Sequence, residues 1–474
     1  MEQESTSRWF PWAAVLAGCG WFCFCAWVSW LRWSNYDIGI DTAGWAQTLH
    51  NGIHRAGWQY TCYTDSALLL SRNYYSIHFY NYLFPFSWAF MLVPHPLTLF
   101  FLQHGAHAVG GIAIGFLARR LSGGDCVFAI LMMTVFFLHP AHARAQTAFD
   151  FNPRQFSLLF IPLAALAAEH GRHQIALWML VALAAGEENL SLAAAFLSWT
   201  FLFRYPEFRT RYGVAGILLC LYTLAVLLFG LPAFLQDGFG IHFAGRYAHL
   251  KNGPLAWIEA VLTPANGKYL LSLLGPILLI PLLRPFPWLI AAVPFAAQNL
   301  LSLAPDTRLI GHHYTTPLSV ALFLACLYGV CAGAPTRRRS SAGLMAGICL
   351  LLSVTLFPTL PYMWEGVDGR TAQLGANLKP IVEKIALTGS VSAPPMVCSH
   401  LWSREHLWFF PNGSREADWV VFPKFLLEYP AIDETRLREL WQEIVSDPGY
   451  SKIIENDDAC LFQRRHETRI EGKN

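Results

Sequence analysis

The chain has 474 residues, of which 54% are hydrophobic and only 14% are charged, and its formal net charge is +2. Soluble proteins average about 25% charged residues, so this composition argues against a soluble globular protein and indicates a polytopic membrane protein. A charge this close to neutral favours no polyanionic partner. Because the sequence carries no nucleic-acid-binding motif, we expect no nucleic acid to bind.

Apolar segments predict about eleven transmembrane helices. The first segment, Phe10 to Trp33, has about 24 residues, which is long enough to cross a membrane and too long for the core of a usual signal peptide. Several later segments are shorter than the roughly 20 residues of a simple span, so their boundaries are approximate. The expected spans are residues 10–32, 97–118, 126–139, 155–170, 174–186, 189–203, 213–232, 267–283, 287–304, 315–333 and 342–360.

The loops between these segments differ in their arginine content. One alternate set contains Arg119, Arg120, Arg172, Arg204, Arg209, Arg211, Arg284 and Arg337 to Arg339. Cytoplasmic loops of membrane proteins carry an excess of Lys and Arg, so this set and the N-terminus are expected in the cytoplasm. We therefore predict a multi-pass membrane protein with an extracytoplasmic C-terminal domain.

Two long connections, residues 33–96 and 233–266, fall on the predicted outer side. The first contains an apolar, aromatic run from Tyr80 to Val93. We predict that this run is a helix lying in the membrane interface rather than crossing it. Both connections belong to the predicted transmembrane domain, residues 1–365.

Residues 375–474 are predicted to form a small soluble α/β domain. Short apolar runs predict strands, and Leu437 to Ser446 predicts an amphipathic helix. We find no phosphate-binding loop or catalytic constellation here, so a lid or docking module is the expected role. Cys398 and Cys460 could form a disulfide outside the cytoplasm, which the sequence does not decide.

Two acidic residues follow the first span. Asp37 and Asp41 are four positions apart, so a helix would place both on one face. Such a pair can bind a hard cation, or one member can act as a general base. Solvated loop acids that cap a helix are the alternative interpretation.

The next outer loop carries Asp150 and Arg154 among aromatic side chains. Arg154 would supply a local partner for Asp150, or Asp150 would face the same cavity as Asp37. Further on, Glu187 and Glu188 interrupt apolar sequence, either between two short helices at the outer face or inside one long helix. Adjacent residues point to different faces, so at most one of them is expected to face a site; a structural role is the alternative.

Histidine and arginine complete the set. His78, His312 and His313 are candidates because neutral imidazole binds metals and imidazolium binds phosphate; structural histidines are the alternative. Arg246 and Tyr247 lie in the second outer connection. An arginine on the outer side is unusual, because Lys and Arg are enriched in cytoplasmic loops. Its planar guanidinium suits phosphate, and a surface role is the alternative.

Each of these patterns is weak alone, but all of them fall on the same predicted side of the membrane. Charged groups near hydrocarbon cost roughly 2.5–3.5 kcal/mol each on insertion scales, so they tend to mark function. Random placement would scatter them over both sides. Their convergence therefore predicts one active site at the outer face.

At these residues the sequence resembles the predicted membrane proteins of the domain-of-unknown-function 2079 family. The resemblance covers about residues 30–335 and extends to the tail. Its motifs are Asp37-Ile38-Gly39-Ile40-Asp41, His78-Phe79, Phe149-Asp150-Phe151-Asn152-Pro153, Gly186-Glu187-Glu188, Arg246-Tyr247 and His313-Tyr314. Asn152 stands where the family has His, and Gly186 stands where it has Lys, so contacts to phosphate or metal can differ here.

The family is similar in layout to the C-type glycosyltransferases. That resemblance implies an all-α polytopic enzyme with an acid in the first outer loop, an in-plane helix and an outer soluble domain. It also implies transfer of a sugar from a polyprenyl-phosphate-linked donor to an unknown acceptor, a glycan, lipid or protein, at the extracytoplasmic face. Sugar, acceptor, stereochemical outcome and oligomeric state do not follow from the sequence.

Under this hypothesis Asp37 is the leading candidate for the base that deprotonates the acceptor. Asp41, Asp150 and Glu187 or Glu188 would orient the acceptor or take part in catalysis, and Asp37 with Asp150 are the candidates for binding Mg²⁺ or Mn²⁺. The expected phosphate-binding residues are Arg246, His313, His312, Arg154, His78 and Tyr247. The alternative function is a transporter or flippase of a lipid-linked or anionic substrate, which would place charges along a path through both leaflets.

Overall fold

The computed structural model describes residues 2–55, 57–62, 72–235, 244–283, 287–355, 370–425 and 432–465. The chain forms two compact units, each assembled from separate stretches. The first unit contains Met1–Ser29, Tyr75–Phe84 and Phe100–Met363. The second unit contains Trp30–Tyr74, Pro85–Leu99 and Trp364–Asn474.

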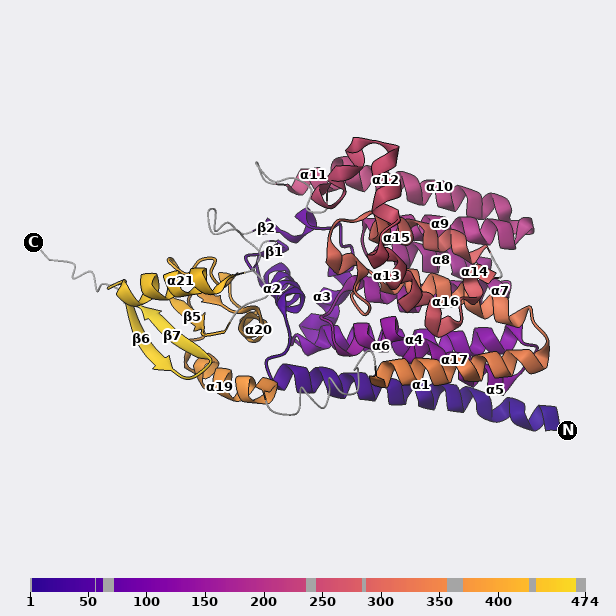
Figure 1. Ribbon diagram of the computed structural model, residues 1–474, viewed down its shortest axis with the longest axis horizontal. Coiled ribbons are helices and arrows are strands. Elements are labelled where there is room, and N and C mark those ends of the chain that lie inside the picture. The colour runs from indigo at the N-terminus through magenta and orange to yellow at the C-terminus, as the bar shows by residue number, and fades with distance from the viewer. Residues whose placement is uncertain are drawn as a thin grey trace, which may run out of the picture. The chain divides into compact units, whose positions relative to one another are not determined.

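The first unit is built from helices that lie side by side (Figure 1). Its first half contains α1 (Glu2–Ser34), α4 (Leu97–Leu121), α5 (Cys126–Leu138), α6 (Pro140–Thr147), η2 (Pro153–Phe156), α7 (Ser157–Glu169), α8 (His173–Ala184) and α9 (Glu188–Arg204). Its second half contains η3 (Pro206–Phe208), α10 (Arg209–Ala225), η4 (Val226–Gly230), α11 (Leu231–Phe234), η5 (Ala244–Asn252), α12 (Pro254–Val261), α13 (Pro264–Leu274), η6 (Gly275–Ile277), α14 (Ile280–Leu283), α15 (Trp288–Leu301), η7 (Pro305–Arg308), α16 (Thr316–Cys331) and α17 (Pro335–Thr355).

Local sequence explains where several of these helices begin. Asp125 accepts a hydrogen bond from the backbone N–H of Phe128 (3.1 Å) and caps α5. Thr263 caps α13 through Asn266 (3.1 Å). Pro140 has no N–H to donate, so α5 and α6 meet at a bend of 53° instead of forming one straight helix.

The centre of the first unit is occupied by α16. Almost every residue of α16 is buried, and the helix contacts α7 and α15. Next to it, α9 packs against α8, α10 and α15. α16 carries apolar side chains on all sides, and their burial shows that other protein segments surround the helix. This arrangement places the ends of α9, α15 and α16 close to one another.

Among the described residues, three helices are long and apolar enough to cross a membrane: Arg8–Ser34, Leu97–Leu121 and Pro206–Phe234. The bent pair α5 and α6 is a fourth candidate, and the other apolar helices in the described part of the chain are shorter. Each predicted span falls mostly on helical residues, with turns or irregular backbone at 278–279 and 302–304, and residues 356–360 lie outside the described residues. The number of about eleven spans stays a prediction.

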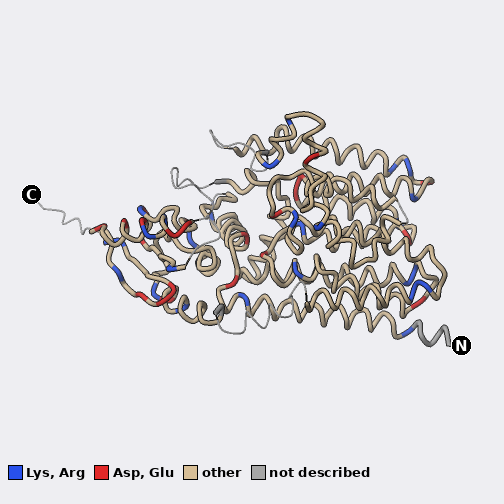
Figure 2. Tube along the Cα trace, viewed as in Figure 1, with Lys and Arg blue, Asp and Glu red and all other residues tan. Residues whose placement is uncertain are grey.

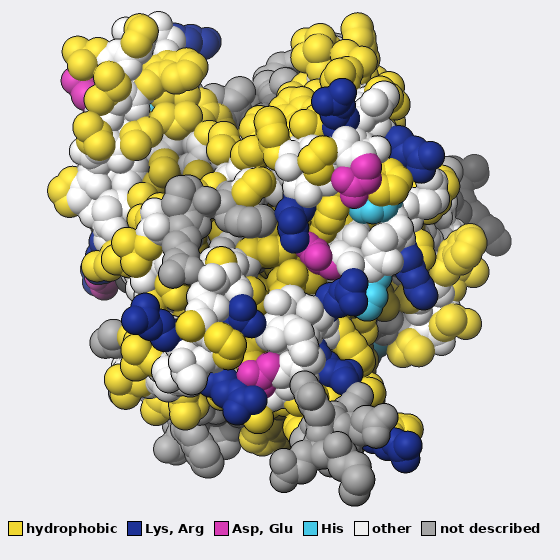
Figure 3. Space-filling model, turned by 90° about the vertical axis from the view of Figure 1, so that its right-hand side faces the viewer, with side chains coloured by type: hydrophobic (Ala, Val, Ile, Leu, Met, Phe, Trp, Pro, Cys, Tyr) yellow, Lys and Arg dark blue, Asp and Glu magenta, His cyan; other side chains and the backbone are white. Residues whose placement is uncertain are grey.

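Many Lys and Arg positions of the first unit lie at one end in the tube view of Figure 2, and Figure 3 shows Lys and Arg side chains on the face at that end. There α4 ends with Arg119 and Arg120, and α9 ends with Arg204. In the same unit, Arg339 of α17 pairs with Asp125 at the start of α5 (2.7 Å). The arginine-rich loops therefore share one end, although Arg284 lies outside the described residues. Which side of a membrane this end faces stays a prediction.

The predicted interfacial run is a helix, α3 (Leu83–Leu92). Several of its large apolar side chains are exposed, among them Trp88 at 75% and Leu92 at 84%. A short helix of this kind suits an interface, where apolar side chains reach lipid. Its location in the membrane interface stays a prediction.

The second unit contains a five-stranded sheet with the strand order β4-β3-β5-β7-β6 (Figure 1). Its strands are β3 (Val391–Ala393), β4 (Leu407–Phe409), β5 (Trp419–Pro423), β6 (Tyr450–Glu455) and β7 (Ala459–Arg464). β3 is parallel to β4 and β5, whereas β7 is antiparallel to β5 and β6. The helices of this unit include α2 (Ile40–His54), α19 (Arg370–Lys384), α20 (Pro395–Cys398), η8 (Ser399–Leu401) and α21 (Glu434–Ser446), and a short ribbon joins β1 (Gln59–Tyr60) to β2 (Arg72–Asn73).

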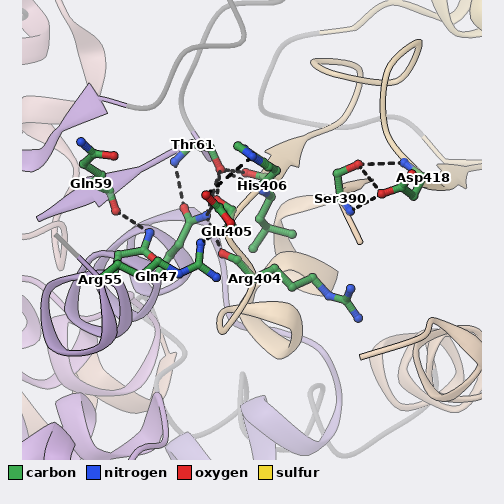
Figure 4. Close-up of polar contacts among 11 residues, drawn as sticks. Gln47, Arg55, Gln59, Thr61, Ser390, Arg404, Glu405, His406 and Asp418 are labelled. Carbon is green, nitrogen blue, oxygen red and sulfur yellow. Dashed lines mark hydrogen bonds and ion pairs between the residues drawn. The ribbon is translucent and has the colours of Figure 1, made fainter. Parts of the chain in front are cut away.

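Within the second unit, α2 is joined to the C-terminal region by a buried polar network (Figure 4). Gln47 donates from Nε2 to Thr61 Oγ1 (2.9 Å) and to the carbonyl oxygen of Arg404 (3.0 Å). The backbone N–H of Thr61 donates to Gln47 Oε1 (2.9 Å). Part of the predicted first outer connection is thus packed with the C-terminal region. The end of the transmembrane domain at residue 365 and the start of the soluble domain at residue 375 stay predictions.

The two cysteines that could have formed a disulfide are buried free thiols. Cys398 belongs to the hydrophobic cluster that contains Val391 and Leu407. Cys460 belongs to a different cluster that contains Phe422 and Phe462. Packing on separate clusters accounts for both side chains without a bond between them.

Candidate functional site

A cavity of about 280 Å³ lies among helix ends and loops of the first unit. Its lining residues are His78, Arg154, Asn189, Leu192, Arg246, Tyr247, Pro294, Phe295, Ala297, Gln298, Leu301 and Tyr314. The lining side chains that can carry a positive charge are two arginines and one histidine, and the lining contains no carboxylate. Such a wall suits an anionic group.

The short helix η2 positions Arg154. Asn152 caps η2 by accepting a hydrogen bond from the backbone N–H of Arg154 (3.0 Å). Arg154 is only 2% exposed, and its Nε donates to Oε1 of Glu187 in a buried ion pair. Burial alone would lower the pKa of Arg154, but the Glu187 carboxylate raises it above its ordinary value. Arg154 therefore stays charged beside the cavity.

Glu187 and Glu188 lie at a break between α8 and α9, so the two-helix alternative is correct. Glu187 has extended backbone (φ −170°, ψ 170°), and Glu188 begins α9. The two carboxylates diverge: Glu187 contacts Arg154, and Glu188 contacts His78. A side chain at Gly186 would meet Leu190 at 2.5 Å, so the backbone at this break is closely packed.

His78 and Glu188 form a second buried pair, in which His78 Nδ1 contacts Glu188 Oε1. The other carboxylate oxygen of Glu188 accepts a hydrogen bond from the backbone N–H of Phe79 (3.1 Å). Burial alone would raise the pKa of Glu188, but the adjacent imidazole and these hydrogen bonds lower it. Glu188 is therefore a carboxylate, and it fixes the orientation of the His78 ring.

Tyr314 contacts both arginines of the cavity. The Arg154 guanidinium carbon is 4.3 Å from the centre of the Tyr314 ring, and that of Arg246 is 5.0 Å from it. Arg246 also pairs with Asp306 (3.5 Å), and its carbonyl oxygen accepts from the N–H of Leu303 (3.0 Å). Cation–π contacts with one shared ring hold two like charges near each other.

Two buried atoms of the Arg154–Glu187 pair lack a hydrogen-bond partner within the described part of the chain. They are Nη1 of Arg154 and Oε2 of Glu187. Leaving a buried polar group unsatisfied costs about 1–3 kcal/mol, and more for a charged group. An unsatisfied guanidinium nitrogen beside a cavity therefore indicates a site for an external acceptor such as phosphate oxygen.

His312 and His313 lie next to this cavity without lining it. Their rings contact Phe149 with centroid distances of 4.2 and 5.0 Å. Burial lowers the pKa of His312 to about 4 and that of His313 well below its ordinary value. Near neutral pH both imidazoles are uncharged, which argues against their predicted role as cationic phosphate ligands.

The remaining predicted acids are placed separately. Asp150 is buried in the first unit, at 7% exposure, just before η2. Asp37 and Asp41 belong to the second unit. There Arg32 donates from Nε to Asp37 Oδ2 (3.1 Å) and from Nη2 to its backbone carbonyl (2.7 Å), and Asp41 lies in the first turn of α2. Their participation in the site stays a prediction.

Within the described ranges, no group of three or more His, Cys, Asp or Glu side chains is arranged to hold a metal ion. Glu187 and Glu188 are engaged by Arg154 and His78. The binding of Mg²⁺ or Mn²⁺ by Asp37 and Asp150 stays a prediction.

Sequence reasoning missed part of this site. Tyr314 and Tyr247 were recognised beside basic residues, but not the ring contact that brings Arg154 and Arg246 together. Asp306 and Gln298 were missed altogether, and Asn189 was recognised only as the neighbour of Glu188, with no role of its own. The sequence does carry one usable signal, because Asp306 is an acid next to the His312-His313-Tyr314 motif.

The fold is similar to that of one solved glycosyltransferase. The crystal structure of ArnT from Cupriavidus metallidurans bound to undecaprenyl phosphate matches with a TM-score of 0.51 and 14% sequence identity. The match covers 93% of this chain and 97% of that chain. ArnT has the C-type glycosyltransferase layout, so the predicted likeness in fold is confirmed. A comparison with curated protein sequences finds no match.

The sequence matches the model of one protein family, described as predicted membrane protein (DUF2079), over residues 51–451. This range includes the cavity residues of the first unit and most of the sheet of the second. The predicted resemblance is therefore confirmed, and the chain belongs to the DUF2079 family of membrane proteins.

Proposed function

We propose that this protein is a membrane glycosyltransferase that moves a sugar from a polyprenyl-phosphate-linked donor to an acceptor at the extracytoplasmic face. One observation carries the proposal: Arg154 and Arg246 line a single cavity that contains no carboxylate in its wall. The similarity to a fold that was crystallised with undecaprenyl phosphate supports the same class of ligand. Fold alone gives limited warrant for function, so the argument depends on the cavity.

The two arginines would hold the phosphate of the donor. A guanidinium group presents several N–H donors in one plane and binds phosphate oxygens in pairs. Nη1 of Arg154, which has no partner among the described residues, would donate to one such oxygen. Arg246 is 20% exposed and would reach the phosphate from the other side of Tyr314.

The same contacts would assist the bond-breaking step. When the sugar leaves the carrier, negative charge develops on the departing phosphate oxygen. Fixed cations that face this oxygen stabilise the transition state more than the ground state. Glu187 and Asp306 each pair with one arginine, so they keep the guanidinium groups in place before the donor binds.

The acceptor would be bound and deprotonated by other polar residues. Asp37 stays a candidate for the general base, and Asp41 and Asp150 stay proposed acceptor-binding residues. The carboxylate of Asp37 accepts a hydrogen bond from Arg32, which would fix its orientation. The polyprenyl chain would lie among the apolar helices.

Transfer of labelled sugar tests the proposal. Full-length protein in detergent would be incubated with radiolabelled polyprenyl-phosphate sugars and a membrane extract as acceptor. Removing one transition-state charge contact typically costs about 10²–10³-fold in rate, so Arg246→Gln should lose that much. Arg308→Gln is the matched control, because Arg308 donates to Asn266 (3.2 Å) and does not line the cavity.

Two results would overturn the proposal. One is unchanged transfer by Arg246→Gln in protein that keeps the thermal stability of the wild type. The other is a wild type that cleaves no donor but moves labelled lipid phosphate between the leaflets of vesicles, which is the behaviour of a flippase.

A further inference from the structure

We propose that His78 accepts the proton of the acceptor hydroxyl and that Glu188 positions His78 for this step. The inference rests on the proposed glycosyl transfer and assigns it a base inside the first-unit cavity. Asp37, which belongs to the second unit, is then not required as the base.

The geometry sets His78 apart from the other histidines beside the cavity. The His78 ring is part of the cavity wall, whereas His312 and His313 are not. Both members of the His78–Glu188 pair are buried, with side-chain exposures of 9% and 1%. Glu188 is held in turn by the backbone N–H of Phe79 (3.1 Å), so the pair is fixed at both ends.

The carboxylate determines which ring nitrogen carries the proton. An ionised glutamate can only accept hydrogen bonds, so Nδ1 of His78 must be the donor in this contact. In the neutral ring Nε2 then carries the lone pair. A hydroxyl bound in the cavity can give its proton only to that nitrogen, and Glu188 stabilises the imidazolium that results.

The proposed step forms one bond at the anomeric carbon and breaks another. The acceptor oxygen forms a bond to the anomeric carbon of the sugar while its proton moves to Nε2 of His78. The bond from the anomeric carbon to the phosphate oxygen breaks, and its electron pair leaves with the polyprenyl phosphate. The proton on His78 is then released to water or to the departing phosphate.

The other charged and titratable groups around His78 fit this role. Those on the elements packed against it are Glu188 of α9, Arg154 of η2, Arg246 of η5, and His313, Tyr314 and Tyr80 of the flanking segments. The two arginines are committed to the phosphate, and burial lowers the pKa of His313 well below its ordinary value. Of the two carboxylates at the α8–α9 break, Glu187 is paired with Arg154, so Glu188 alone is available to orient His78.

Nucleophile rescue tests the role of His78. General base catalysis contributes about 10²–10⁴-fold, so His78→Ala should lose that much transfer to hydroxyl acceptors. Azide is already an anion and needs no base, so adding sodium azide should restore sugar release from labelled donor in His78→Ala and form a glycosyl azide. A purely structural role for His78 predicts no rescue.

The rate of transfer tests the positioning role of Glu188. In Glu188→Gln the negative charge that stabilises the imidazolium is lost, so kcat should fall. Glu188→Asp should recover part of the rate, which a purely structural role does not predict. Exposed His170 and Glu207 offer matched controls, His170→Gln and Glu207→Gln, whose rates should equal that of the wild type.

The outcomes separate the two proposals. These tests require that the wild type transfers sugar and that His78→Ala and Asp37→Asn keep its thermal stability. The assignment of His78 is then overturned if His78→Ala loses transfer and azide does not restore sugar release. It is also overturned if azide rescues Asp37→Asn instead. Glycosyl transfer itself would still stand. If the wild type transfers no sugar from any donor, glycosyl transfer itself is overturned.

Discussion

Two buried arginines, one in each unit, show how structural and functional polar groups differ. Arg404 in the second unit is 5% exposed, and its two terminal nitrogens donate to the backbone carbonyls of Gly389 (3.0 Å) and Ala386. Arg154 in the first unit is 2% exposed, but its Nη1 has no partner among the described residues. The first arginine is fully used by the fold, whereas the second retains a donor for a ligand.

The pKa values of Arg404 and Arg154 are shifted in opposite directions. Burial lowers the pKa of Arg404, which has carbonyl partners. Burial also acts on Arg154, but the Glu187 carboxylate outweighs it and raises the pKa. Keeping a charge buried with an incomplete set of hydrogen bonds is expensive, and this cost fits the proposed role of Arg154 in binding a ligand.

The largest expected effect comes from splitting the Arg154–Glu187 pair. Arg154→Met alone leaves Glu187 as an uncompensated buried charge, which typically costs about 3–5 kcal/mol. Replacing both residues, Arg154→Met with Glu187→Met, removes the two charges together and should restore most of the stability. Thermal unfolding in detergent measures the first effect, and binding of undecaprenyl phosphate should be lost in both variants. Retained binding in the double variant would contradict a ligand role for Arg154.

Acidification should destabilise the first unit through His312. The pKa of His312 is lowered to about 4 in the folded protein from 6.5, mainly by burial. The unfolded chain therefore binds the proton more tightly, so stability is full above about pH 6.5 and is lost as the pH falls toward about 4. At about 1.4 kcal/mol per pKa unit the loss reaches about 3 kcal/mol.

His312→Phe keeps a ring against Phe149 but cannot bind a proton. Its melting temperature should therefore fall less between pH 7 and pH 4.5 than that of the wild type. His170→Phe, at an exposed position, should behave like the wild type. Equal acid sensitivity of His312→Phe and the wild type would show that His312 is not buried in its neutral form.

A smaller effect is expected from Arg404→Met, which removes two hydrogen bonds to backbone carbonyls of exposed residues. The net contribution of one such hydrogen bond to stability is about 0.5–1.5 kcal/mol. The melting temperature should fall, whereas the affinity for undecaprenyl phosphate should not change. Arg438 of α21 is 75% exposed and pairs with Glu434, so Arg438→Met should change stability by less than about 1 kcal/mol. Weaker lipid-phosphate binding in Arg404→Met would remove the contrast between the two arginines.

Helices were the easiest part of the fold to predict. The apolar segments could be recognised as helices because their length and their hydrophobic pattern can be read from local sequence alone. The break at Glu187 and Glu188 remained undecided, since both alternatives satisfy the same pattern. The packing of α2 with the C-terminal region was not predicted, because it depends on Gln47 and Thr61, two uncharged residues that stand out in no motif.

The sequence predicted which residues belong to the site better than it predicted which of them pair with each other. Sequence reasoning named Arg154, Arg246 and His78, which line the cavity, but it offered Asp150 as the partner of Arg154. The ion pair of Arg154 joins it instead to Glu187, 33 residues further along the chain. Long-range pairing of this kind follows from how α7, α8 and α9 pack, and no local spacing encodes it.

The most direct test of the account is a density map of the protein with undecaprenyl phosphate bound. We predict that the phosphate lies within hydrogen-bond distance of both Arg154 and Arg246, beside Tyr314. Phosphate density at the arginine-rich end near Arg119 and Arg339, with the cavity left unoccupied, would contradict the account.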